Sequence, residues 1–277
     1  MTYAITTPLA EPRPRLRDLT AAEWIKLRSL RSTPIAYATT ALAVLAFNLG
    51  TAYDTVSNWS QQEAGDAARF IADGIPLQHA FNDNAVVVLI LALGALGAFT
   101  AVGEYATGTI RTTFAAVPAR GAVMGAKAAV LALFTTAFGL LLALLSFFGS
   151  QLILGTKDVG IGLGDPGALR VLLASTFIAP VAALTGLALG ALIRHTAPTM
   201  IAAVAVLLVL PMILTDGRHL SAVLGHATPS QAWQRLVEHH YVPRQFGWSE
   251  GGAWTVYGVW ALVAVVVAVV SVRRRDQ

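Results

Sequence analysis

The sequence predicts an all-α integral membrane protein with six transmembrane helices and with both the N-terminus and the C-terminus in the cytoplasm. Three observations lead to this fold class. Hydrophobic residues make up 56% of the 277 positions and charged residues only 12%, whereas about a quarter of the residues in a soluble domain are charged. Several apolar stretches approach the 20 or so residues that a helix needs to cross a bilayer. Most cations lie in segments that six spans would place on one side.

The apolar stretches define six predicted spans within a single transmembrane domain over residues 18–272. A run of this length with almost no charge is typical of a transmembrane helix. The third span is longer than a bilayer requires, so we expect its first turns to stand in the cytoplasm. The predicted spans are Ile35–Tyr53, Asn84–Val102, Lys127–Leu154, Leu169–Ile193, Pro198–Leu214 and Ala253–Val272.

The distribution of charge sets the orientation, because lysine and arginine are enriched in cytoplasmic loops. With the N-terminus inside, the cytoplasmic side holds 13 of the 19 cations and five of the 15 acids. The isoelectric point near 9.7 therefore reflects topology, and we expect no nucleic-acid partner. The last residues, 273–277, form a basic cytoplasmic tail. We expect a multi-pass protein of the cytoplasmic membrane.

Two segments precede the first span. Residues 1–17 contain three prolines and three arginines, and we expect a disordered basic leader. The stretch DLTAAEWIKLRSLRST, residues 18–33, has good helix formers and ends before Pro34. It suits a helix lying at the level of the lipid headgroups, although simple topogenic positive charge explains the same residues equally well. The residues that would hold such a helix at the interface are Trp24, Lys26, Arg28 and Arg31.

The segment 215–252 is expected on the outer side as a re-entrant or cap segment. It contains four histidines, two tryptophans and the helix-like stretch SQAWQRLVEHHYV. The histidine spacings match neither H-x3-H nor HExxH, so aromatic anchoring at the interface is favoured over a metal site. The four histidines are His219, His226, His239 and His240.

The chain lacks the sequence patterns of a catalytic protein. There is no G-x-S-x-G or HExxH, and no charged residue falls in the central part of a predicted span. The stretch GAVMGAKAA lacks the G-K-[ST] ending of a P-loop. We therefore expect no catalytic residue, metal or cofactor in this chain. Small and mildly polar residues within the spans, such as Ala183, Gly186 and Gly190, are expected to serve helix packing.

The most informative stretch is GEYATGTIRTTFAAVPARG, which forms the predicted loop 103–121 between the second and third spans. Glu104 stands where the second span ends. Gly108 can take the positive φ of a tight turn, and the Thr109 hydroxyl can cap a following helix. Pro118 ends that helix, after which Arg120 and Gly121 are expected to turn the chain back.

The predicted helix after Gly108 carries its apolar residues on one face. Ile110, Phe114 and Val117 share a stripe, while Arg111 and its threonine neighbours occupy other faces. The residues alone leave two interpretations open. The stripe either dips into the headgroups as in an ordinary interfacial helix, or it enters a groove on a soluble partner.

The run E-Y-A-T-G-T-I-R, followed by V-P-A-R-G, resembles the first cytoplasmic loop of type-2 ATP-binding-cassette (ABC) permeases. The six spans, the basic leader with EWIKLRSLRSTP and the long last outer segment resemble the layout of the same family. The resemblance implies that residues 18–33 form an elbow helix and that a short coupling helix in loop 103–121 contacts an ATPase. The coupling residues that it implies are Glu104, Gly108, Thr109, Ile110, Arg111, Phe114, Val117 and Arg120.

The resemblance also implies the function: a permease subunit of a bacterial ABC exporter. Two permease halves, identical or paralogous, would form the substrate pathway in the lipid membrane. Two separate ATPase subunits would bind ATP and Mg²⁺, and the substrate would be hydrophobic or amphipathic. Two alternatives remain open from the sequence: a polytopic membrane enzyme that uses the outer histidines, and a non-transporting scaffold or immunity subunit.

Overall fold

A computed structural model describes residues 15–29, 32–60, 66–214, 217–239 and 246–275, and its regular elements are helices, with no strand among the described residues. Six of the helical segments are long and apolar enough to cross a membrane, which confirms the predicted all-α class and the number of spans. In chain order they are α2 (Ser32–Ser57), α6 (Asp83–Thr107), α8 (Arg120–Leu154), α9 (Ala168–Ile193), the α10–η2–α11 segment (Thr196–Val204, Ala205–Val209 and Leu210–Ile213) and α14 (Glu250–Arg275).

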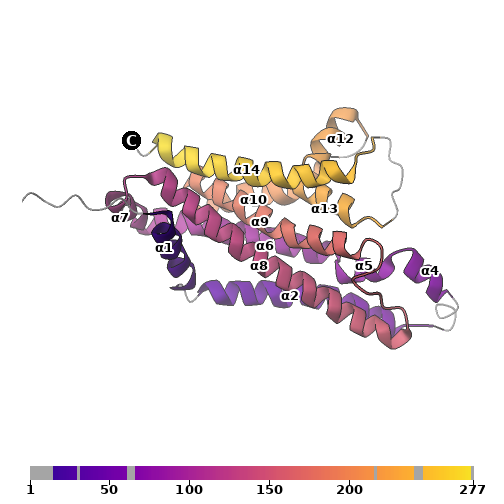
Figure 1. The fold of residues 1–277 in the computed structure, drawn as a ribbon. Helices are drawn as coiled ribbons and strands as arrows, with labels where there is room; N and C mark the ends of the chain where they lie inside the picture. The colour runs from indigo at the N-terminus through magenta and orange to yellow at the C-terminus, as the bar shows by residue number, and fades with distance from the viewer. Residues whose placement is uncertain (1–14, 30–31, 61–65, 215–216, 240–245, 276–277) are drawn as a thin grey trace, which may run out of the picture.

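The long helices run side by side, and the short helices lie at the two ends of the bundle (Figure 1). We call the end that carries α1 (Leu16–Ser29), α7 (Thr109–Ala116) and the last turns of α14 the α1 end. The opposite end is called the α12 end. Its short elements are α4 (Ala67–Ala72), α5 (Ile75–Ala80), η1 (Gly155–Lys157), α12 (His219–His226) and α13 (Pro229–Val237).

Helix α9 is the centre of the bundle and packs against α6, α8 and α14. Its contact with α6 is the most extensive in the described structure, and it is made by small residues. A Cβ added to Gly186 would overlap the carbonyl oxygen of Gly94, and one added to Gly97 would overlap that of Ala183. The predicted packing role of Gly186 is therefore confirmed, and its partner surface lies on α6.

Polar side chains join neighbouring helices inside the bundle. Asn48 of α2 donates to the hydroxyl of Ser146 on α8 at 2.9 Å, and its amide oxygen accepts from the backbone of Asn82 at 3.0 Å. The indole of Trp233 donates to the hydroxyl of Ser175 on α9 at 3.1 Å. These bonds satisfy polar groups that hydrocarbon surroundings would leave unpaired, and they confirm packing as the role of the mild polar residues.

Segment 215–252 differs from the expected interfacial helix. The helix-like stretch forms α13, which packs on α9 and α14. Trp233 is only 2% exposed, so it is anchored in protein and not at a lipid interface. Between α2 and α6, helix α5 packs against α2 and α8.

Several element boundaries also differ from those predicted. Helix α1 begins at Leu16, inside the segment expected to be disordered, and it ends at Ser29. Helix α6 continues past Gly103 to Thr107, and α8 already begins at Arg120. Helix α14 extends into the predicted tail as far as Arg275. Residues 1–14 of the predicted leader and residues 276–277 of the tail lie outside the described residues.

Candidate functional site

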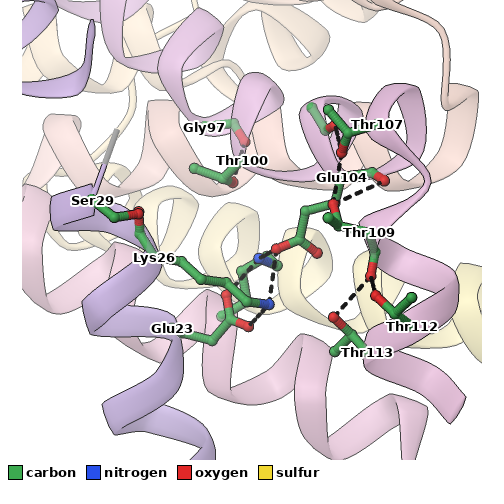
Figure 2. A network of polar contacts seen from close by, with 12 residues as sticks. Glu23, Lys26, Ser29, Gly97, Thr100, Glu104, Thr107, Thr109, Thr112 and Thr113 are labelled. Carbon is green, nitrogen blue, oxygen red and sulfur yellow. Dashed lines mark hydrogen bonds and ion pairs between the residues drawn. The ribbon is translucent and has the colours of Figure 1, made fainter. Parts of the chain in front are cut away.

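Four charged side chains from three helices meet at the α1 end and form a network, here called the charge cluster: Glu23 and Lys26 of α1, Glu104 of α6 and Lys127 of α8. The Lys127 ammonium donates to Glu23 at 2.5 Å and to Glu104 at 2.8 Å. Lys26 donates to Glu23 at 2.7 Å and to Glu104 at 3.0 Å. Figure 2 shows the side chains of Glu23, Lys26 and Glu104 pointing toward one another.

The charge cluster is buried on one side and reaches solvent on the other. Glu23 and Lys127 are each 5% exposed, whereas the side chain of Lys26 is 39% exposed. Two carboxylates and two ammonium groups make the cluster neutral, which offsets the cost of removing the charges from water. The three helices are therefore tied together where α6 and α8 approach loop 103–121.

Lys26 remains charged in this network. Burial favours its neutral form, but the hydrogen bond to Glu23 and the negative charges of Glu104 and Glu23 outweigh burial and raise its pKa above the ordinary value. A raised lysine pKa stabilises the fold at all pH values below the ordinary pKa, and this contribution is lost as the pH rises through the raised value. The Lys26 ammonium group therefore keeps its charge at neutral pH.

Aromatic contacts also hold α1 against the bundle. The ring of Trp24 meets that of Phe134 on α8 edge to face, with centroids 5.9 Å apart. Tyr37 of α2 contacts the same phenylalanine at 4.8 Å. Among the residues predicted to sit at the headgroups, Lys26 thus belongs to the charge cluster, and Trp24 contacts protein on one side but is 39% exposed. Arg28 is exposed, and Arg31 lies outside the described residues.

The turn between α6 and α7 depends on Gly108. Its φ of +74° confirms the predicted left-handed conformation, which residues with a side chain rarely adopt. The predicted cap by Thr109 is wrong, because Thr109 is the first residue of α7. Its hydroxyl instead contacts the hydroxyl of Thr107 at 2.7 Å and donates to the Glu104 carbonyl at 3.4 Å. The Thr109 side chain therefore joins the start of α7 to the end of α6.

Helix α7 directs its apolar stripe inward. Ile110 and Phe114 belong to the buried core, and Val117, the residue after the helix, is half-buried against it. Both interpretations of the stripe, in the headgroups or in a partner's groove, are therefore corrected for Ile110 and Phe114, since the chain itself covers these two residues. The exposed face of α7 carries Arg111, Thr112, Ala115 and Ala116.

Pro118 follows the end of α7 as predicted, but Arg120 does not turn the chain. It is the first residue of α8, and its guanidinium lies 5.6 Å from the centre of the Phe114 ring. This cation–π contact joins the end of α7 to the start of α8. Loop 103–121 is therefore a compact unit, fixed to the bundle by Gly108, the inward stripe and Arg120.

Sequence reasoning singled out Glu104 and Lys26 but missed Glu23 and Lys127, the other two members of the charge cluster. The only signal was that glutamates and lysines occur near the ends of three helices predicted on the same side. Because Glu23 and Lys127 are 104 residues apart, no local pattern could pair them.

The described outer histidines, His219, His226 and His239, do not gather into a metal site. His219 meets Phe246 edge to face at 5.1 Å, and His226 stacks on Trp248 at 4.6 Å. Within the described part of the chain, no group of three or more His, Asp or Glu could hold a metal ion. His240 lies outside the described residues.

Comparison with known proteins assigns no family. No family model matches the chain, and the search of curated proteins gave no match.

Proposed function

We propose that this chain is the permease subunit of a type-2 ABC exporter and receives force from separate ATPase subunits through loop 103–121. Two such chains, or this chain and a paralogue, form the substrate pathway, and the α1 end faces the cytoplasm. The proposal is supported by the resemblance of EYATGTIR and VPARG to the family's first cytoplasmic loop. The six long apolar helices agree with the expected layout.

The observation that carries the proposal is the attachment of α7 to α6 and α8, two helices that the charge cluster joins to α1. Helix α7 follows α6 after one glycine, while Arg120 holds it to α8. The charge cluster then connects the end of α6 to α1 and α8. A push on the exposed face of α7 therefore moves α1, α6 and α8 together. When the ATPase subunits bind nucleotide and close, such a unit can pass their movement to the spans and change how the spans pack.

The proposed contact face is the exposed side of α7. Replacing Ala115 with Asp places a charge there, so we expect ATPase binding to weaken about tenfold or more, the size of a hot-spot loss. ATPase binding is measured by copurification with the tagged full-length chain. Stimulation of the ATPase is measured as substrate-stimulated ATP hydrolysis in liposomes. Thr156→Asp, an exposed change at the α12 end, is the control. If the Ala115→Asp variant binds and stimulates the ATPase normally, the proposed docking face is wrong. If no ATPase copurifies with the unaltered chain, a scaffold or immunity subunit is favoured.

The proposed orientation can be tested directly because the chain contains no cysteine. A single cysteine at Asp165, which is exposed near the α12 end, should react with a membrane-impermeant maleimide in intact cells. A single cysteine at Arg28, exposed on α1, should react only after permeabilisation. The reverse pattern would place the α1 end outside and would contradict docking of a cytoplasmic ATPase.

A further inference from the structure

A cavity of about 710 Å³ lies between α1, α2, α6 and α8, next to the charge cluster. This volume is within the range of about 300–1,000 Å³ typical of small-molecule sites. The coupling mechanism proposed above makes no use of it. Its walls are mainly apolar and come from the spans, with Tyr37 of α2, Leu96 and Phe99 of α6 and Leu131 of α8 among the lining residues.

One end of the cavity is polar. Glu23, Lys26, Glu104 and Lys127 line that end. The first turns of α2 add the hydroxyls of Ser32 and Thr33. Because Leu96 lies two turns before Glu104 on α6, the polar lining is at the end of a span and the apolar lining is deeper in it. The cavity therefore has the polarity of one membrane leaflet, from headgroup to acyl chain.

The hydrogen bonds of the charge cluster leave both an acceptor and a donor available. Glu104 accepts both lysines through Oε1, while its Oε2 is buried and has no partner. Rotation of the carboxylate about its soft terminal torsion can turn one oxygen toward the cavity. Lys26 uses two of its three ammonium protons on Glu23 and Glu104 and is partly exposed.

The charge balance disfavours a ligand whose head group carries a net charge. The cluster is already neutral, so a cationic or anionic head would add an uncompensated charge in a half-buried place. A hydroxyl group is neutral, and it can donate to Glu104 while it accepts from Lys26. An unpartnered buried carboxylate oxygen gains most from such a donor, because its lost hydration is replaced.

We propose that this cavity binds a neutral, hydroxyl-bearing membrane lipid of the monoacylglycerol type. The hydroxyl head lies between Glu104 and Lys26, and the acyl chain lies along Leu96, Phe99 and Leu131. Bound there, the lipid contacts α1 and α6 on either side of the charge cluster. This inference is independent of ATPase coupling, because it rests on the cavity and the cluster alone.

Photocrosslinking of the full-length chain in nanodiscs tests the proposal. The probe is a monooleoylglycerol with a diazirine in its acyl chain, and mass spectrometry locates the labelled peptides. We expect labels within residues 32–37, 96–104 and 127–131. Unlabelled monooleoylglycerol should compete about tenfold or more better than methyl oleate, which has no hydroxyl donor. Unlabelled monooleoylglycerol should also compete better than oleate and oleylamine.

Two variants separate ligand recognition from loss of folding. Leu96→Trp places a bulkier ring in the apolar part of the cavity, where the acyl chain is proposed to lie, without altering the charge cluster, and should abolish labelling. Val87→Trp, on an exposed position of the same helix, should leave labelling unchanged. Glu104→Gln gives the cluster a net positive charge, so oleate should become the best competitor. A misfolded protein would show no such switch.

The following results would overturn the proposal. Labels confined to other segments would place the lipid elsewhere. Equal competition by all four compounds would show binding of acyl chains without head-group recognition, and oleate or oleylamine as the best competitor of the unaltered chain would assign a charged ligand. Persistence of the labels in Leu96→Trp would exclude this cavity.

Discussion

Replacing Lys127 with Met is expected to destabilise the protein by about 3–5 kcal/mol, the usual cost of removing one partner from a buried ion pair. The variant leaves Glu23 and Glu104 with Lys26 as their shared cation. Both carboxylates remain largely covered, so water cannot replace the lost ammonium group. The measurement is the free energy of unfolding in mixed micelles, by denaturant titration.

A second substitution shows whether charge balance causes this loss. Lys127→Met with Glu23→Gln removes one charge of each sign and leaves the pair of Lys26 and Glu104. We expect this double variant to regain most of the lost stability. Lys157→Met, the same change at an exposed position, is the control and should have little effect. Equal stability of Lys127→Met and the unaltered chain, or no recovery in the double variant, would refute the role assigned to the charge cluster.

Replacing Gly186 with Ala is the second change for which we expect a large effect. The added Cβ would overlap the carbonyl oxygen and carbon of Gly94 and crowd the backbone of Ala98. Since these are backbone atoms of a packed helix, the clash is relieved only if α6 and α9 separate. Overpacking of this kind costs about 1–3 kcal/mol and occasionally more. The expected result is a lower free energy of unfolding and less monodisperse protein in detergent.

Gly258 of α14 provides the matched control. It is also an interior helix glycine, but no heavy atom lies within 4 Å of an added Cβ. Gly258→Ala should therefore be neutral or stabilising by up to about 1 kcal/mol, because alanine loses less backbone entropy than glycine in a helix. If both substitutions have the same effect, close approach of α6 and α9 is not what requires Gly186.

The spans could be predicted from the sequence because the length of an apolar stretch is a local property. All six predicted spans coincide with long helices, and Gly108 takes the expected positive φ. The errors concern helix ends, where tertiary contacts decide. Helix α6 continues beyond Gly103, since Glu104 is neutralised by two lysines and can remain in a packed helix.

The candidate site was less predictable, because it depends on contacts between distant segments. The stripe of Ile110 and Phe114 was correctly identified from its spacing, but spacing alone does not say what covers a stripe. The chain itself covers it in the structure. The contact between Glu23 and Lys127 likewise requires α1 to fold back across α8, which no local pattern encodes.

The central place of α9 has a consequence for the order of assembly. It is the fourth span in the chain, so it enters the membrane before α14, the helix that later packs against it. Its apolar surface makes it stable in lipid while α14 is still absent, and hydrophobicity then provides little drive for the two helices to associate. Specific bonds must select the final arrangement. Tyr257 of α14 donates to the carbonyl of Ala174, and Trp233 donates to Ser175. These two bonds, at adjacent positions of α9, therefore fix how α13 and α14 align with α9.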